Sequence, residues 1–316
     1  MSYGFRVVLA GVLPAQGPSE KGKATQPQPT ANFDEADRQA LAVLEKAAKE
    51  EAEGEAAARL EEARQEAARL KPLREEAARK VVWTNTLGMK FVRVPGTKVY
   101  FSVWETRRQD YRAYADSSKG QYPSAGYLDR QWEGSFFSGD THPVMNVSWE
   151  DAHKFCEWLT NMERAMQRIN RRSFYRLPTD GEWSLAVGLS EANGGTPKEK
   201  HAQTPNVYPW GTQWPPPRGS GNFARILQVD NYDQTAPVGS FTPNQHGIYD
   251  LGGNVAEWCE DYFNGQDGRR LLRGGACEGS SAAKMLMSSY RIDRQGDYRS
   301  GDAGFRVVLV VGSAAK

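Results

Sequence analysis

The sequence predicts an α+β fold that is rich in coil and is preceded by a charged helical spacer. Three observations predict this fold. From Trp83 onward, short apolar runs alternate with Gly and Pro turns, which is typical of short strands. The segments 108–116 and 149–169 have the apolar spacing of amphipathic helices. Residues 34–80 consist mainly of Ala, Glu, Arg and Leu, which are strong helix formers.

Four segments follow one another along the chain. We expect a terminal strand at 1–11, a flexible linker rich in Pro, Gln, Ser and Thr at 12–33, the charged helical spacer at 34–80 and the folded domain at 83–311. The leucines of the spacer are too sparse for a sustained heptad seam. A solvated helix is therefore expected, and the alternative is a weak coiled coil that would allow self-association. Pro72 is expected to kink or end the helix.

The first residues repeat a segment near the end of the chain. The run YGFRVVL at 3–9 matches AGFRVVL at 303–309 in six of seven positions, and its β-branched residues predict a buried strand. Because the second copy closes a domain, we expect residues 1–11 to be the terminal strand of a lost upstream repeat in a tandem array. The alternative is that the first copy pairs within the same domain.

Secondary structure is predicted most clearly in the first part of the domain. Strands are expected at 91–95 and 100–104, each bounded by turn residues. The helix at 149–169 is preceded by Ser148 as its N-cap, with Asp151 three residues later. Its expected apolar face consists of Ala152, Phe155, Cys156 and Leu159.

The composition excludes several classes of function. The 316 residues carry a net charge of +1, so no global field favours nucleic acid or a membrane surface. No apolar run reaches the roughly 18 residues of a membrane span, and the first residues lack the features of a signal peptide, which leaves the compartment open. Three cysteines without regular spacing predict neither a disulfide framework nor a zinc site.

A series of short motifs from 85 to 309 resembles the formylglycine-generating enzyme family, also called the sulfatase-modifying-factor domain. The longest are HPVMNVSW at 142–149, YRLPTDGEW at 175–183 and NQHGIYDLGGNVAEW at 244–258, and LRGG follows at 272–275. The resemblance implies an α+β fold related to C-type lectins. In this region we expect Trp183, Trp210 and Trp258 to lie in the core. We also expect a buried polar network that consists of Arg176, Asp180 and Glu182.

The resemblance also implies two structural calcium sites, because enzymes of this family carry them. Calcium accepts about six to eight oxygen ligands in irregular geometry, which suits Asn and Asp side chains flanked by loop carbonyls. The implied ligands are Asn222 and Asp230 with the carbonyls of Phe223 and Tyr232 in one site, and Asn254 and Glu257 in the other. The alternative is that these polar groups only hydrogen-bond the loops.

Enzymes of this family oxidise a sulfatase cysteine to formylglycine, and they use a pair of cysteines that holds copper(I). Alignment on the Gly-Gly and Gly-Phe-Arg motifs places that pair near Gly279 and Lys284, neither of which is a cysteine. Cys277 lies close by in the sequence, but a lone thiol cannot form a two-thiolate copper site, so copper is not expected. The alternative is an oxidase with an unusual site at Cys277.

The expected function is therefore that of a noncatalytic, calcium-stabilised ligand- or protein-binding domain in a multidomain protein. Residues 276–302 are rich in Tyr, Arg, Asp and Met, a composition typical of recognition surfaces for a protein or peptide. In lectin-like variable proteins of diversity-generating retroelements, this segment is the diversified ligand face. Such a variable protein is therefore a further alternative for the function. The other alternative is that the segment is an ordinary divergent surface. The candidate ligand-binding residues are Glu278, Met285, Met287, Tyr290, Arg291, Asp293, Arg294, Asp297, Tyr298 and Arg299.

Overall fold

The computed structural model describes residues 35–117, 139–191, 194–265, 268–278 and 281–312. The predicted strand at 1–11 and the predicted linker at 12–33 lie outside these residues, as does Gly279. The chain divides into two compact units, Met1–Leu60 and Glu61–Lys316. All packing described below lies within the second unit. Each helix in the described ranges is too short or too polar to span a membrane.

The charged segment folds as α1 (Glu35–Arg79), which crosses the boundary between the two units. The helix does not end at Pro72, although a proline removes one backbone hydrogen bond. Packing offsets this loss, because Leu70 and Ala77 are buried and Arg74 donates to the carbonyl of Ser240 at 2.8 Å. The last turns of α1 therefore belong to the core of the second unit rather than to a solvated spacer.

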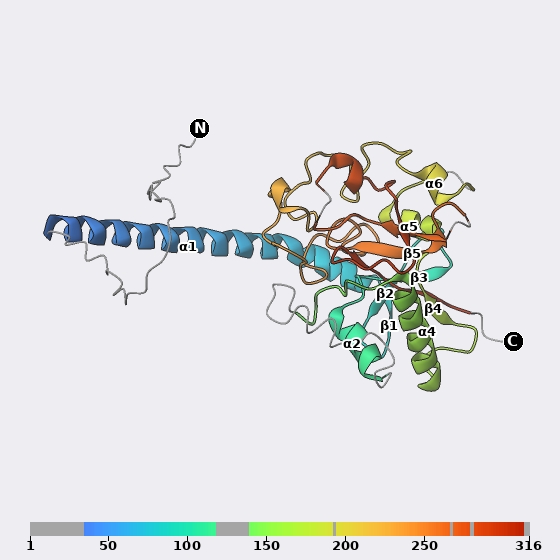
Figure 1. Ribbon diagram of the computed structural model, residues 1–316. Coiled ribbons are helices and arrows are strands. Elements are labelled where there is room, and N and C mark those ends of the chain that lie inside the picture. Colours follow the sequence, from blue (N-terminus) through green and yellow to red (C-terminus); the bar gives the residue numbers. More distant parts are fainter. Residues whose placement is uncertain (1–34, 118–138, 192–193, 266–267, 279–280, 313–316) are drawn as a thin grey trace, which may run out of the picture. The chain divides into compact units, whose positions relative to one another are not determined.

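Five short strands form the first sheet, which has the order β1-β2-β3-β9-β4 and is antiparallel throughout (Figure 1). The predicted strands at 91–95 and 100–104 correspond to β2 and β3, with slightly earlier bounds. The closing strand β9 lies between β3 and β4, so the end of the chain completes the sheet. The bounds are β1 (Val81–Thr84), β2 (Lys90–Arg93), β3 (Val99–Ser102), β4 (Phe174–Arg176) and β9 (Val308–Val310).

The second sheet has the order β7-β6-β5-β8, in which β5 pairs antiparallel with β6 and parallel with β8. Arg306 follows β8 and links the two sheets, because its guanidinium bonds Glu257 of β5 and the carbonyl of Ser102 in β3. The bounds are β5 (Ala256–Tyr262), β6 (Arg269–Arg273), β7 (Ile292–Gln295) and β8 (Ala303–Gly304).

Helix α4 (Trp149–Ala165) begins where the sequence predicts and ends before the predicted residue 169. Ser148 accepts a hydrogen bond from the amide of Asp151, and the Asp151 carboxylate accepts one from the amide of Ser148. This capping box satisfies two otherwise unpaired donors. The predicted apolar face is buried, and α2 (Arg108–Ser117) packs beside it, with the rings of Tyr111 and Phe155 5.9 Å apart.

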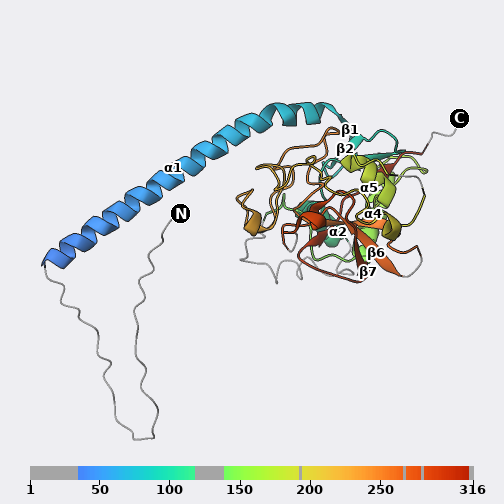
Figure 2. The same ribbon diagram turned by 90° about the horizontal axis from the view of Figure 1, so that it is seen from above.

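Much of the remaining chain is coil, drawn in yellow and orange in Figure 2. As predicted, Trp183 and Trp258 are buried in the core. Trp210 was also expected in the core, but it is only half-buried and stacks on Tyr208, with ring centroids 5.0 Å apart. Short helical segments interrupt the coil at α5 (Asp180–Val187), α6 (Pro197–Lys200), η1 (Arg225–Leu227) and η2 (Ala283–Leu286).

Candidate ligand-binding site

A pocket of about 420 Å³ opens beside β7, the edge strand of the second sheet. Six of the ten residues predicted to bind a ligand surround it, so the fold gathers most of the predicted face into one concave site. These six are Glu278, Met285, Tyr290, Arg291, Asp293 and Arg294. The remaining lining residues are His201, Ala256, Phe263, Ala276, Ile292 and Asp302.

The pocket combines an aromatic wall with carboxylates. The ring of His201 lies 4.8 Å from that of Tyr290 and 6.3 Å from that of Phe263. Burial, and then the charge of Lys284, lowers the pKa of His201, which favours the neutral imidazole. The carboxylate of Asp293 is paired with Arg269, whereas those of Glu278 and Asp302 add acceptors to the lining. The site therefore suits a ligand with apolar surface and hydrogen-bond donors.

Four of the predicted ligand residues lie outside this pocket. Met287 packs against a small apolar cluster, and Tyr298 packs against the main core. Arg299 forms an ion pair with Asp151 at the start of α4. Asp297 is exposed. The predicted face is therefore divided between a concave site and residues that support neighbouring elements.

Arg291 lines the pocket, but its guanidinium is committed to the protein itself. Its Nε and Nη2 donate to the two carboxylate oxygens of Asp180 at 2.9 and 2.8 Å, and Nη2 also donates to Glu191 at 2.7 Å. Its Nη1 donates to two main-chain carbonyls. The ligand-binding role expected for Arg291 needs correction, because this side chain holds the pocket wall. Its acidic partners are Asp180 and Glu191.

Sequence reasoning missed Arg273, which completes this network. The residue ends β6 and is fully buried, where it bonds Asp180 and donates to the carbonyl of Ser288 at 2.7 Å. The expected network joined Asp180 to Arg176 and Glu182, but those two residues pair with each other at 2.7 Å. The available signal was Arg273 itself, which directly follows two leucines in the motif LLRGG, because a buried charge requires a partner.

All three cysteines belong to the described residues, and each is a buried free thiol. Cys277, in the coil after β6, is 6% exposed. Burial, with the charges of Glu278 and Glu105, raises its pKa to about 12, which leaves very little thiolate at neutral pH. Of the two positions aligned with the family cysteines, Lys284 lies in η2 and Gly279 lies outside the described residues.

The first predicted calcium loop is organised around Asp230. Its carboxylate accepts hydrogen bonds from the amides of Phe223 at 2.9 Å and of Tyr232 at 3.0 Å. Asn222 is buried, and its Nδ2 donates to the carbonyl of Gln234, but its Oδ1 has no hydrogen-bond partner. A buried oxygen without a donor is a group that a cation can satisfy. These residues therefore fit a calcium ion.

The second predicted loop gives its two side chains other partners. The oxygens of Glu257 accept from Arg306 at 2.7 and 2.5 Å, and one also accepts from Trp183 at 2.9 Å. Asn254 uses its Oδ1 to accept from two amide groups, one of them the side chain of Asn222. Because a guanidinium already neutralises Glu257, the calcium role expected for Asn254 and Glu257 does not fit this geometry, and both residues hold the loop.

Two buried carboxyl groups near this loop were not predicted. Asp250 accepts from the amide of Gly239 at 2.7 Å, but its Oδ1 has no partner, and burial raises its pKa to about 6. Glu105 accepts from the side chain of Asn254 at 2.6 Å. Burial, and then the charges of Asp250 and Glu257, hold the pKa of Glu105 well above its usual range. The signal for Asp250 was its place in the motif YDLGGN.

Side-chain amides and main-chain oxygens would have to supply much of any metal coordination. Within the described ranges, no three or more His, Cys, Asp or Glu side chains are grouped so that they could hold a metal ion. With one carboxylate, the loop around Asp230 would bind calcium with modest affinity.

The fold and the pocket define a coil-rich α+β domain in which the segment after Gly274 and Gly275 forms a concave site. The chain belongs to the family described as the sulfatase-modifying factor enzyme 1-like domain, whose model matches residues 64–311. The matched range includes the last turns of α1 as well as the domain expected at 83–311. The predicted α+β fold of the formylglycine-generating-enzyme type is thereby confirmed.

Individual relatives include proteins named as enzymes and proteins named as inactive. The formylglycine-generating enzyme of Streptomyces coelicolor is 32% identical over 197 residues, which are 55% of this chain and 56% of the relative. Inactive C-alpha-formylglycine-generating enzyme 2 of Bos taurus is 32% identical over 174 residues, 52% of this chain and 49% of the relative. The chain thus spans about half the length of both relatives, and family membership leaves its activity open.

Among solved structures, Treponema denticola variable protein 1 is similar with a TM-score of 0.47 and 19% identity, over 66% of this chain and 84% of that chain. PvdO from Pseudomonas aeruginosa is similar with a TM-score of 0.45 and 18% identity, over 67% of this chain and 80% of that chain.

Proposed function

We propose that this chain is a noncatalytic, calcium-stabilised ligand-binding domain of a multidomain protein, with the pocket beside β7 as its binding face. The state of Cys277 carries the proposal. This thiol is the cysteine nearest in sequence to the positions where family enzymes hold copper(I), and it is buried with a pKa of about 12. Because residues 276–302 contain no second cysteine, they cannot supply the two soft thiolates that copper(I) prefers.

The lining of the pocket supports a protein or peptide as the ligand. Tyr290, His201 and Phe263 present rigid aromatic surface, which dominates the binding energy of many interfaces. The carboxylates of Glu278 and Asp302 accept hydrogen bonds from donors on such a ligand. Since the wall is anchored by the ion pair between Arg291 and Asp180, little conformational entropy is lost when the ligand binds.

Calcium would be held by Asn222 and Asp230 with the carbonyls of Phe223 and Tyr232, and it would stabilise the folded loop by mass action. Its role in this proposal is structural. The loop lies outside the residues that line the pocket, so ligand binding and metal binding can be tested separately.

A displayed library of random peptides tests the binding face. Wild type is expected to enrich a defined set of peptides, and both Tyr290→Ala and Glu278→Lys are expected to lose them. Lys98→Glu is the matched control, because Lys98 is exposed and does not line the pocket. Peptides that bind Tyr290→Ala and Glu278→Lys as tightly as wild type would place the binding face elsewhere.

The alternative function is that of a formylglycine-type oxidase, which the similarity to the Streptomyces coelicolor enzyme favours. It is tested by incubating the purified chain with copper(I), oxygen and a cysteine-containing sulfatase peptide, with mass spectrometry as the readout. We expect no oxidation on a protein that is folded by circular dichroism. Oxidation of the peptide that disappears in Cys277→Ala would contradict the proposal and would indicate an oxidase with a rearranged active site.

The variable protein of a diversity-generating retroelement is the other alternative. It predicts that copies of the gene within one population differ mainly in residues 276–302. Sequencing such copies distinguishes it from a binding domain of constant sequence, in which substitutions are not concentrated in that segment.

A further inference from the structure

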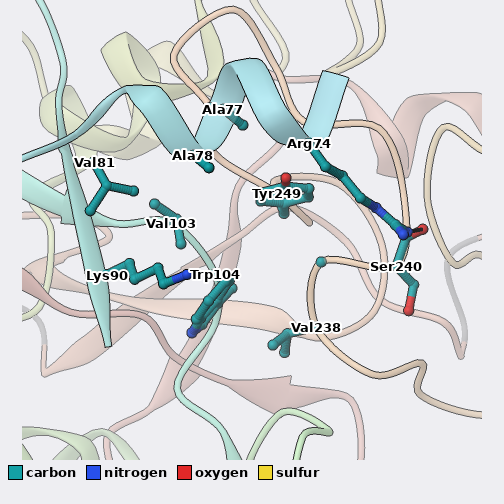
Figure 3. A pocket seen from close by; sticks show the side chains of 12 residues that line it. Arg74, Ala77, Ala78, Val81, Lys90, Val103, Trp104, Val238, Ser240 and Tyr249 are labelled. Atoms are coloured by element: carbon teal, nitrogen blue, oxygen red, sulfur yellow. Dashed lines mark hydrogen bonds between the residues drawn. The ribbon is translucent and has the colours of Figure 1, made fainter. Parts of the chain in front are cut away.

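A second pocket, of about 410 Å³, lies where the end of α1 meets the first sheet. Figure 3 shows the side chains of Arg74, Lys90, Trp104 and Tyr249 around this cavity. The helix contributes Arg74, Ala77 and Ala78, and the opposite side is formed by the turn that contains Val238. None of these residues lines the pocket beside β7, so this is a separate site.

The lining of this second pocket carries positive charge without an acidic residue. Among the described residues that line this pocket, only Arg74 and Lys90 are charged. The other lining residues are apolar, aromatic or small. Arg74 is fixed at the rim by its bond to the carbonyl of Ser240 at 2.8 Å. The ammonium group of Lys90 lies 5.8 Å from the ring centroid of Trp104.

Gly239 lies close to both large rings of this pocket. Gly239 has a left-handed backbone with φ of 74°, and a Cβ atom there would lie 3.8 Å from both Trp104 and Tyr249. A side chain at position 239 would therefore contact both rings. The pocket is lined by two aromatic side chains, with cationic groups beside them.

From this geometry we propose that the pocket binds a small aromatic carboxylate. The planar body lies against Trp104 and Tyr249, and the carboxylate is neutralised by Lys90. The volume of the cavity falls in the range of small-molecule sites, and apolar walls with a few convergent polar groups are typical of such sites. Charge complementarity selects an anion over a cation, because the lining supplies two positive charges and no negative one.

Three probes that share one ring test the charge selection: indole-3-acetate, indole-3-acetamide and tryptamine. Binding to the full chain is measured by isothermal titration calorimetry and by ligand-observed NMR. We expect the carboxylate to bind most tightly, the neutral amide roughly 10-fold more weakly and the amine least. Equal dissociation constants for the three probes, the reverse order, or no binding of the carboxylate at millimolar concentration would overturn the proposal.

Variants locate the binding to this pocket. Lys90→Gln is expected to weaken indole-3-acetate roughly 10-fold while leaving the amide unchanged, because it removes only the charge. Ala78→Trp is expected to abolish binding of both probes, since Ala78 is exposed at the rim and a large ring there fills the cavity. Lys98→Gln, outside the pocket, is the matched control. Unchanged affinity for indole-3-acetate in both Lys90→Gln and Ala78→Trp would contradict the assignment.

Discussion

Asp180 binds Arg291 through both of its carboxylate oxygens, at 2.9 and 2.8 Å. Asp180 opens α5, whereas Arg291 directly precedes β7, so the contact joins two distant parts of the chain. The same carboxylate bonds Arg273 at the end of β6. One buried acid therefore holds two arginines, of which Arg273 precedes the segment 276–302 and Arg291 lies within it.

Replacing Asp180 with Asn is expected to lower the free energy of unfolding by about 3–5 kcal/mol at pH 7, because two buried arginines lose their counter-charge. Burial alone would raise the pKa of Asp180, but Arg273 and Arg291 more than offset it, so its pKa lies below the usual value. The stabilisation is therefore complete above about pH 4 and is lost as the pH falls through the lowered pKa of the folded state.

Urea denaturation at pH 7 and pH 3 measures this contribution. The difference between wild type and Asp180→Asn should be smaller at pH 3 than at pH 7. The exposed Asp297 provides the control, since Asp297→Asn is expected to change stability by less than about 0.5 kcal/mol. A difference that is independent of pH would show that the charge of Asp180 is not what stabilises the fold.

Cys277 should react very slowly with thiol reagents in the folded protein. With a pKa of about 12, roughly one thiol in ten thousand is ionised at pH 8, and burial further restricts access. Alkylation with iodoacetamide at pH 8, followed by peptide mass spectrometry, should label Cys277 only after denaturation in urea. Labelling of Cys277 in the native protein within seconds would contradict the buried, neutral thiol and would strengthen the oxidase alternative.

Calcium is expected to raise the melting temperature of the wild-type protein by about 2–5 °C at a concentration well above its dissociation constant. Asp230→Ala should remove this increment, because it removes the carboxylate from the loop that contains Asn222. Asp233→Asn is the control, since Asp233 is an exposed acid nearby that pairs with Arg225. Differential scanning fluorimetry with EDTA or calcium gives the increments, and equal increments in wild type and Asp230→Ala would reject this calcium site.

Gly247→Ala is expected to cost about 1–3 kcal/mol of unfolding free energy. Gly247 has φ of 82°, and a Cβ atom there would lie 3.3 Å from backbone atoms of Ala77 in α1. Gly181→Ala is the matched control, because nothing lies within 4 Å of its Cβ position in α5, so it should be neutral or slightly stabilising. Chemical denaturation compares the two variants, and equal effects would contradict the close packing of α1 on the loop at Gly247.

The sequence by itself determined the features that depend on neighbouring residues. The capping box of Ser148 and Asp151, and the apolar face of α4, follow from spacings of three and four residues along the chain. The order of short motifs indicated the family and its α+β fold. The burial of Trp183 and Trp258 agrees with the general tendency of tryptophan to be buried, whereas Trp210 is only half-buried.

The tertiary structure decided which polar groups meet. Arg291 was expected at a ligand face and Glu257 at a calcium ion, but their partners are Asp180 and Arg306, which lie 111 and 49 positions away. The residue type shows only that a buried charge requires a counter-charge. The partner of each buried charge depends on how β5, β6, β7 and β9 assemble. These ion pairs join segments that no local sequence pattern connects.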